Sequence, residues 1–170
     1  DSLYVGLMIK NENPYLIEFN VRMGDPECQT ILPLLENDLS EIFFDCCVGK
    51  LSEKKIKLSN EKSICIVLCS KGYPEDYKKD SEISKLNKLS LKDNEYIYHA
   101  GTKLKDNKIL NSGGRVLNFV STSNNLKESR DDLIKLIKIL DWKDGFFRKD
   151  IAYKVIAVSY THLRAHETGC

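Results

Sequence analysis

Residues 16–27 have the sequence Leu-Ile-Glu-Phe-Asn-Val-Arg-Met-Gly-Asp-Pro-Glu, in which apolar and polar side chains alternate before a turn. The polar positions of the alternation are Glu18, Asn20 and Arg22. The apolar positions between them are Ile17, Phe19 and Val21. Side chains two residues apart share a face of a β-strand. The pattern therefore predicts a strand with one polar face and one apolar face that is available for burial.

The polar face carries side chains that suit phosphate and metal chemistry. Oxygen atoms of Glu18 and Asn20 suit a hard cation such as Mg²⁺, which proteins often hold with one or two ligands while substrate phosphates supply others. The planar guanidinium of Arg22 suits phosphate or carboxylate. The turn Gly24-Asp25-Pro26-Glu27 adds two more carboxylates. A solvated strand face is the alternative, but a plain surface strand does not need such a turn.

The composition is that of a folded protein. Of the 170 residues, 42% are hydrophobic and 30% are charged, and the formal net charge is +1. These values exclude a disordered chain and give no reason to expect a nucleic-acid or membrane partner. The longest apolar runs, such as residues 64–69, are too short to span a bilayer. The chain starts at Asp1 within a strand-like pattern, which we interpret as a sign of a fragment.

The six cysteines form no CxxC pair, and most lie in apolar patterns. We expect reduced thiols in the core of a cytoplasmic protein, with neither a zinc site nor a redox pair. The cysteines are Cys28, Cys46, Cys47, Cys65, Cys69 and Cys170.

The first part of the chain predicts a hairpin and two helices. Strands are expected at residues 3–9 and 15–21 with a slightly long loop between them. A helix over residues 27–35 is limited by Pro33, and a second helix over 38–48 starts with a capping-box-like pair, Asp38 and Glu41. A polar connector, residues 50–62, follows it. We expect a domain boundary there, with the first domain over residues 1–50.

The second part predicts strands, a long helix and a further strand, which is an α+β arrangement. The expected strands are residues 64–69, 95–99, 103–110, 115–121 and 147–156. Asn125 and Glu128 open the helix. Its apolar stripe consists of Leu126, Leu133, Ile134, Ile137 and Leu140.

Other motifs have both a structural and a functional interpretation. Gly113-Gly114-Arg115 is either a hairpin turn or a phosphate nest. His99 is either a structural histidine or an acid–base group. In each case the structural interpretation is the simpler one, as it is for the turn at residues 71–74 and for the acidic pair Asp131-Asp132.

Residues 18–27 resemble the signature of the phosphoribosylamine–glycine ligase (glycinamide ribonucleotide synthetase) family, ATP-grasp enzymes of purine biosynthesis. The resemblance is collinear over residues 3–156. Its further elements are Leu3-Tyr4-Val5-Gly6-Leu7-Met8, Gly72-Tyr73-Pro74, His99-Ala100-Gly101-Thr102, Gly113-Gly114-Arg115-Val116-Leu117 and Arg148-Lys149-Asp150-Ile151. It implies that residues 1–50 end an ATP-grasp domain, as a hairpin plus helices. Residues 51–157 would then form a small mixed α/β carboxy-terminal domain.

The resemblance also implies an activity, in which ATP and glycine give an enzyme-bound glycyl phosphate that 5-phosphoribosylamine attacks. The products would be glycinamide ribonucleotide, ADP and phosphate. Glu18 and Asn20 would bind Mg²⁺ or Mn²⁺, and Arg22 would stabilise the transferred phosphoryl group. Residues Gly24, Asp25, Pro26 and Glu27 would line the substrate pocket. Met8 would pack under the adenine, or else is a core methionine.

One position departs from the wider superfamily, and part of the enzyme would be missing. Many ATP-grasp enzymes carry a second metal-binding acid about where Gly6 stands, so this site would have only two protein ligands. The nucleotide contacts from the other side would lie upstream of residue 1. We therefore expect the fragment to bind ATP poorly and to be inactive without the amino-terminal domains of the same enzyme.

Two alternative functions remain. One is another ATP-grasp carboxylate–amine ligase or a carboxylase, and the other is a non-catalytic nucleotide-binding module. Residues 158–170 do not fit the family and look like translated sequencing adapter, so we expect a non-native tail. We therefore do not assign a metal site to its His162 and His166.

Overall fold

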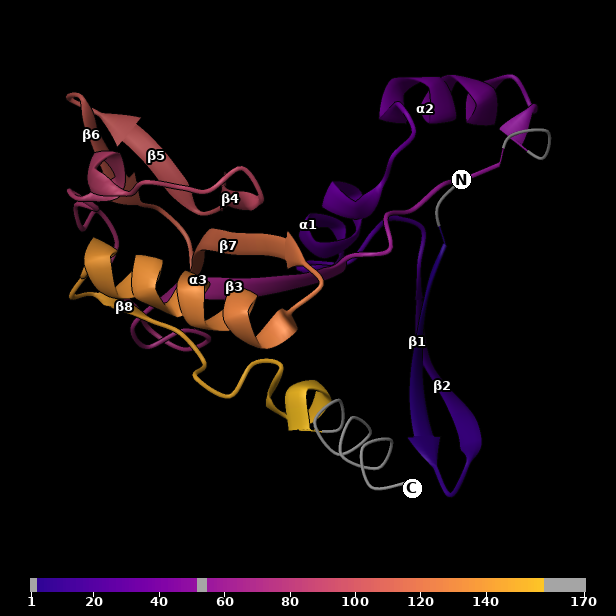
Figure 1. The fold of residues 1–170 in the computed structure, drawn as a ribbon. Helices are drawn as coiled ribbons and strands as arrows, with labels where there is room; N and C mark the ends of the chain where they lie inside the picture. The colour runs from indigo at the N-terminus through magenta and orange to yellow at the C-terminus, as the bar shows by residue number, and fades with distance from the viewer. Residues whose placement is uncertain (1–2, 52–54, 158–170) are drawn as a thin grey trace, which may run out of the picture. The chain divides into compact units, whose positions relative to one another are not determined.

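The chain divides into two compact units, Asp1–Ser59 and Asn60–Cys170. A computed structural model describes residues 3–51 and 55–157 (Figure 1). The division lies within the expected connector but later than residue 50. The reason is that part of the connector forms hydrogen bonds with the first unit. The Ser59 amide donates to the Leu34 carbonyl at 2.7 Å, and the Lys57 amide donates to Asn37 Oδ1 at 2.6 Å. The expected tail lies outside the described residues.

The first unit begins with the predicted hairpin. Strand β1 (Tyr4–Lys10) pairs antiparallel with β2 (Asn13–Asn20). The loop is tighter than expected, because Lys10 already pairs with Asn13 and only two residues make the turn. Those residues, Asn11 and Glu12, have φ of 50° and 63°, the left-handed conformation of a tight hairpin turn.

A β-bulge divides the hairpin into two registers. Gly6 pairs with Glu18, whereas the next residue, Leu7, pairs with Leu16, so that Ile17 is the extra residue. Paired side chains share a face, so the pairing assigns each residue of the hairpin to one of two faces. One face carries Tyr4, Gly6, Met8, Tyr15, Glu18 and Asn20. The other carries Val5, Leu7, Ile9, Pro14, Leu16 and Phe19.

The apolar face of this strand, which the sequence makes available for burial, is exposed in this chain. Ile17, Phe19 and Val21 are 61%, 60% and 84% exposed. A two-stranded hairpin has no interior of its own, and no described residue of the chain buries these side chains.

Two helices follow the hairpin, as expected. Helix α1 (Glu27–Ile31) gives way to a 3₁₀ turn, η1 (Leu32–Leu34), at Pro33. Helix α2 (Leu39–Cys47) is capped by the Asp38 carboxylate, which accepts from the amides of Ser40 and Glu41. It stops at Gly49, whose φ is 73°.

The second unit is built on a four-stranded antiparallel sheet in the order β4-β7-β3-β8. Its strands are β3 (Lys62–Ser70), β4 (Glu95–His99), β7 (Arg115–Ser123) and the two-residue β8 (Gly145–Phe146). A separate pair, β5 (Thr102–Lys105) and β6 (Lys108–Asn111), forms a hairpin. A short 3₁₀ turn, η3 (Leu86–Lys88), lies in the connection before β4. The α+β class predicted from the element order is confirmed.

The core of this unit lies between the sheet and the long helix α3 (Leu126–Leu140). This helix packs against β7 and β3 (Figure 1). The predicted stripe is confirmed at Leu133, Ile137 and Leu140, which are buried against the sheet. Leu126 and Ile134 are only partly buried. Leu136, which the predicted stripe leaves out, is buried as well.

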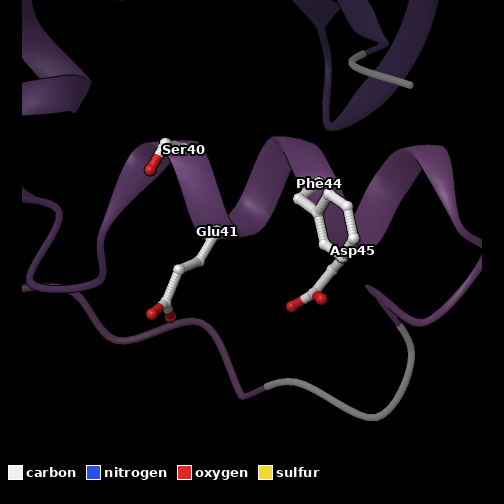
Figure 2. Close-up of a pocket in the computed structure, with 4 residues that line it drawn as sticks. All are labelled: Ser40, Glu41, Phe44 and Asp45. Atoms are coloured by element: carbon white, nitrogen blue, oxygen red, sulfur yellow. The ribbon is translucent and has the colours of Figure 1, made fainter.

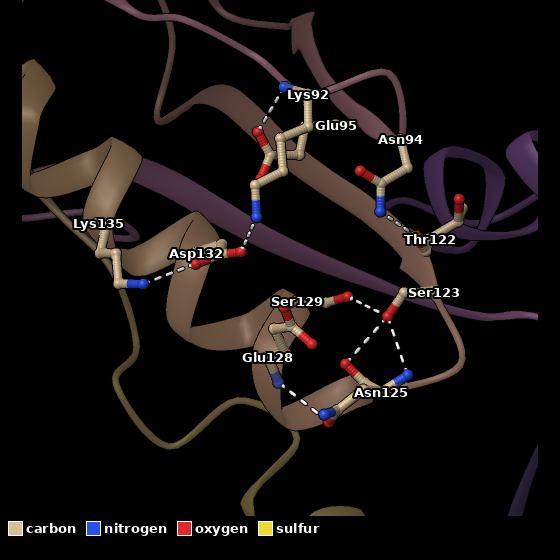
Figure 3. A network of polar contacts seen from close by, with 10 residues as sticks. All are labelled: Lys92, Asn94, Glu95, Thr122, Ser123, Asn125, Glu128, Ser129, Asp132 and Lys135. Carbon is tan, nitrogen blue, oxygen red and sulfur yellow. Dashed lines mark hydrogen bonds and ion pairs between the residues drawn. The ribbon is translucent and has the colours of Figure 1, made fainter.

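A network of polar contacts surrounds the first turns of α3 (Figure 3). Asn125 caps the helix by accepting from the Glu128 amide at 3.2 Å, as predicted. The Ser123 and Ser129 hydroxyls lie 2.8 Å apart. The Asp132 carboxylate accepts from Lys135 at 2.7 Å and also pairs with Lys92. These two lysines hold the pKa of Asp132 below its ordinary value.

Two strand predictions in the second unit are wrong. Residues 103–110 form a hairpin rather than one strand, because Asp106 and Asn107 adopt positive φ of 50° and 59° and turn the chain back. Residues 147–156 are not a strand, because sheet pairing ends at Phe146 and residues 153–157 are helical.

The cysteines are free thiols in the described part of the chain, but only Cys65 is buried. The expectation of core thiols therefore holds for that residue, and Cys47 is exposed. Among the described residues, none of the helices is both long enough and apolar enough to cross a membrane.

Candidate functional site

Glu18 and Asn20 lie at the end of β2, on one face of the hairpin. Across the strand pair, Glu18 faces Gly6 and Asn20 faces Tyr4. Met8 lies farther along the same face, opposite Tyr15, and is 58% exposed. The structure thus brings the two expected metal ligands together, with an exposed thioether on the same side.

Arg22 lies beyond the strand. Because β2 ends at Asn20, the alternation that aligns Glu18 with Asn20 does not extend to Arg22, which sits in a bend. Its Nη1 donates to the Met23 carbonyl at 2.9 Å. The side chain is exposed, and a guanidinium has further donors available for a phosphate.

The turn after Arg22 is tied closely to helix α1. The Cys28 amide donates to the Gly24 carbonyl at 3.0 Å, and Gln29 Nε2 donates to Asp25 Oδ1 at 2.9 Å. A Cβ on Gly24 would lie 2.0 Å from Glu27 Oε2, so the Glu27 carboxylate packs against the glycine. The acids of the predicted pocket are therefore fixed by local contacts to α1.

The donor set suits a hard cation that is shared with a ligand. Glu18 and Asn20 offer two oxygen-bearing side chains from adjacent positions of one strand face, and the Glu18 side chain takes up the space beside Gly6. Among the described residues, no group of three or more His, Cys, Asp or Glu side chains is arranged to hold a metal ion. A cation here would depend on oxygen atoms from a substrate.

The motifs of the second unit meet at one end of its sheet. Strands β3 and β4 end there and β7 begins there, because β7 is antiparallel to both. This brings together the turn after β3, the turn after β4 and the loop before β7. The side chains they expose include His99 and Arg115.

Glycines allow these loops to touch. A Cβ on Gly101 would lie 2.5 Å from the Arg115 carbonyl oxygen and 2.6 Å from Gly113 Cα. A Cβ on Gly114 would lie 2.0 Å from the ring of Tyr73. The Gly113 amide donates to the Gly101 carbonyl at 3.2 Å. These contacts favour the structural interpretation of the Gly-Gly-Arg motif over the phosphate nest.

Polar side chains complete the loop contacts. His99 Nδ1 lies 2.9 Å from Thr102 Oγ1 within its own turn, and Arg115 Nε donates to the Tyr73 hydroxyl at 3.2 Å. The Ser70 hydroxyl donates to the Gly113 carbonyl at 2.9 Å. The family resemblance pointed to these loops, but no motif in the sequence indicated the part played by Ser70.

The last motif, residues 148–151, is held by an arginine that the sequence analysis did not select. Arg130 on α3 donates through Nε to the Ile151 carbonyl at 2.9 Å and through Nη2 to the Lys149 carbonyl. Arg148 forms a two-point pair with Asp150, at 3.1 and 2.6 Å. This pair raises the pKa of Arg148 and lowers that of Asp150.

The described residues also form shallow hollows away from these motifs. One, of about 460 Å³, is lined by Ser40, Glu41, Phe44 and Asp45, all on α2 (Figure 2). Another, of about 190 Å³, borders the corner after α3 and includes Trp142 and Asp144. Hydrogen bonding to Ser81 and the charge of Lys78 hold the pKa of Asp144 low. Neither hollow involves the predicted site residues.

A family model described as the C domain of phosphoribosylglycinamide synthetase matches residues 63–154, more than half of the chain. The chain belongs to the phosphoribosylglycinamide synthetase family. The matched residues include the three loops that meet at the end of the sheet and the segment held by Arg130. The resemblance noted from the sequence is thus confirmed.

Curated relatives of this synthetase family match nearly the whole chain. A phosphoribosylamine–glycine ligase from Caldanaerobacter subterraneus is 43% identical over 150 residues, which are 88% of this chain and 35% of the relative. The trifunctional purine biosynthetic protein adenosine-3 from Gallus gallus is 40% identical over 156 residues, 91% of this chain and 16% of that protein. The chain thus spans about a third of the length of the Caldanaerobacter relative.

A solved structure agrees with the family assignment. A crystal structure of phosphoribosylamine–glycine ligase from Thermotoga maritima is similar with a TM-score of 0.68 and 31% sequence identity. The similarity covers 88% of this chain and 36% of the solved chain. Since the matched part extends well beyond residues 63–154, the first unit shares in the likeness.

Proposed function

We propose that this chain is the carboxy-terminal part of an ATP-dependent ligase of purine biosynthesis, acting in the cytoplasm. The reaction would join glycine to 5-phosphoribosylamine and give glycinamide ribonucleotide, ADP and phosphate. The observation that carries the proposal is the hairpin face with Glu18 and Asn20 ahead of the Gly24–Glu27 turn, in a chain of this family. The relatives named for this ligase support the choice of substrates.

Each residue of the first unit has a proposed role in that reaction. Glu18 and Asn20 bind Mg²⁺ or Mn²⁺, which supplies positive charge to the nucleotide phosphates when it is bound. Arg22 neutralises charge on the transferred phosphoryl group. Gly24, Asp25, Pro26 and Glu27 form part of the substrate pocket, and Met8 packs near the adenine.

The proposed chemistry has two displacements. A carboxylate oxygen of glycine attacks the γ-phosphorus of ATP, ADP leaves, and glycyl phosphate is formed. The amine nitrogen of 5-phosphoribosylamine then attacks the carbonyl carbon, phosphate leaves, and the amine loses a proton. Such phosphoryl transfer depends chiefly on positioning and on charge neutralisation.

The activity would require more than this chain. The chain covers 35% of the Caldanaerobacter relative and 36% of the solved Thermotoga chain, and the hairpin leaves its apolar face exposed. We therefore propose that the remaining part of the enzyme supplies the other nucleotide contacts. The term complete ligase is used below for a protein in which that remaining part precedes this chain. We expect residues 1–170 alone to show no turnover.

Glycine-dependent ADP formation by the complete ligase tests the proposal. With ATP, glycine and 5-phosphoribosylamine, Glu18→Gln should reduce the rate about a hundredfold or more, because the neutral amide binds the metal ion more weakly and the nucleotide phosphates then lose the positive charge that it supplies. Glu12→Gln, on the same hairpin at its exposed turn, is the matched control and should keep the rate. A wild-type rate for Glu18→Gln at ordinary Mg²⁺ would remove Glu18 from the metal site.

The same assay distinguishes the alternative functions. A carboxylase would form ADP with bicarbonate in place of glycine, and a nucleotide-binding module would form none with either substrate. Turnover by residues 1–170 alone would contradict the requirement for the remaining part.

A further inference from the structure

We propose that Gly6 is a positioning residue, whose missing side chain lets the Glu18 carboxylate lie where it can bind the metal ion. This inference rests on the metal-binding role proposed for Glu18. It adds to the proposed metal site a residue of the neighbouring strand, Gly6, which does not itself bind the metal ion.

The register of the hairpin puts Gly6 directly opposite Glu18. A Cβ on Gly6 would lie 3.0 Å from Glu18 Cγ, which is closer than carbon atoms normally approach. Gly6 is buried, whereas most other residues of β1 are exposed. The side chain of Glu18 therefore occupies the space that a side chain at position 6 would fill.

The extra residue of the adjacent bulge, Ile17, lies on the other strand, and the backbone conformation of Gly6 does not itself require a glycine. Its φ is not positive, in contrast to Gly49 and Gly72, so other residues can adopt its conformation. Glycine within a strand is less stable than alanine, and it often marks a place where another group comes close. Here the close group is the side chain of Glu18.

A methyl group at position 6 would displace this side chain and little else. The next atoms it would meet are Tyr4 Cε1 at 3.5 Å and the Glu18 amide nitrogen at 3.7 Å, both at ordinary contact distances. The strand pairing can therefore stay as it is while Glu18 turns about its Cα–Cβ bond. We expect a variant that folds normally and binds the metal ion poorly.

The test measures Mn²⁺ binding to the complete ligase by electron paramagnetic resonance, in the presence of a non-hydrolysable ATP analogue. Four proteins form a double-mutant cycle: the wild type, Gly6→Ala, Glu18→Ala and the double variant. Gly6→Ala should raise the Kd for Mn²⁺ about tenfold, the size expected when a residue that orients a metal ligand is changed. The thermal unfolding midpoint should stay at the wild-type value or rise.

The double variant is the matched control, because it adds the same methyl group where there is no carboxylate to displace. There Gly6→Ala should change the Kd by less than about twofold relative to Glu18→Ala alone. An equal loss in both backgrounds, or none in either, would overturn the positioning role while leaving Glu18 as a ligand. An unchanged Kd for Glu18→Ala alone would instead overturn the proposed metal site, and the role of Gly6 with it.

Discussion

At the scale of single residues, the amide of Asn111 holds together three segments of the second unit. The side chain is fully buried and accepts from the Ser81 amide at 2.7 Å. Its nitrogen donates to the Ser70 hydroxyl at 2.9 Å and to the Lys78 carbonyl at 2.7 Å. Ser70 in turn donates to the Gly113 carbonyl, so this amide supports the loop that touches Gly101.

We predict that Asn111→Ala lowers the free energy of unfolding of the second unit by about 3 kcal/mol, since it leaves buried partners unsatisfied. Urea denaturation followed by circular dichroism measures the change. Asn124→Ala, at an exposed position, should stay within about 0.5 kcal/mol of the wild type. Equal effects of the two substitutions would contradict the role of the buried amide.

A pH dependence follows from Asp132. Its pKa is lowered by Lys135 and Lys92, so the folded protein holds this proton less tightly than the unfolded chain. The contribution of the Asp132 carboxylate to the free energy of unfolding is fully present above the unfolded pKa of about 3.9. It is lost as the pH falls through the lower pKa of the folded protein. Asp132→Asn should therefore cost about 1 kcal/mol at pH 7 and progressively less below about pH 4.

Chemical denaturation of the wild type and of Asp132→Asn between about pH 3 and pH 7 checks this expectation. This range includes the unfolded carboxyl pKa of about 3.9. Asp93→Asn, an exposed aspartate on the connection before β4, is the control and should have little effect at any pH. A stability difference for Asp132→Asn that does not depend on pH would contradict the assigned cause.

Residue spacing predicted one part of the candidate site and missed another. Glu18 and Asn20 share a face as predicted, because strand alternation is a local property. The sequence did not predict the position of Arg22, because this residue lies beyond the end of β2. Hydrogen bonding between the strands decides where β2 ends, and residue spacing does not show that. Asn111 and Gly6 were not recognised for a related reason. Their neighbours come from strand register and from distant loops.

At the scale of secondary-structure elements, α3 and the strands under it account for most of the buried core. We predict that Leu133→Ala, at a fully buried position, destabilises the second unit by about 2–5 kcal/mol. Ile139→Ala on the same helix should be nearly neutral, because that side chain is 53% exposed. Thermal unfolding of both variants measures the contrast. Similar losses would contradict the assignment of the helix face.

Element prediction succeeded where the signal was local. Capping residues and apolar periodicity located α2 and α3, and a continuous apolar run located β3. It failed over residues 103–110, where Asp106 and Asn107 are ordinary polar residues until their positive φ is known. It failed over residues 147–156 because apolar side chains there pack on the core without sheet pairing.

At the scale of the whole molecule, the two units differ in how much they bury. Every residue of the buried hydrophobic core cluster belongs to the second unit, and the hairpin of the first unit exposes apolar side chains on both strands. The amides of β3, β7 and α3 should therefore exchange with deuterium at least about a thousandfold more slowly than those of β1 and β2 in residues 1–170.

Hydrogen exchange followed by mass spectrometry of the chain measures this difference. In the complete ligase the hairpin should become protected, since its apolar face would then be covered. Equal protection of the hairpin and of β7 in the isolated chain would contradict this account, because it would mean that the first unit is stable by itself.

The exposed hairpin also has a consequence for quality control in the cell. Chaperones and proteases bind extended apolar segments, and the strand face with Leu16 and Phe19 is such a segment while nothing covers it. The second unit offers them little, because its apolar side chains are mostly buried. A polypeptide in which the rest of the enzyme fails to fold would thus be recognised through β1 and β2, even while its carboxy-terminal unit is intact.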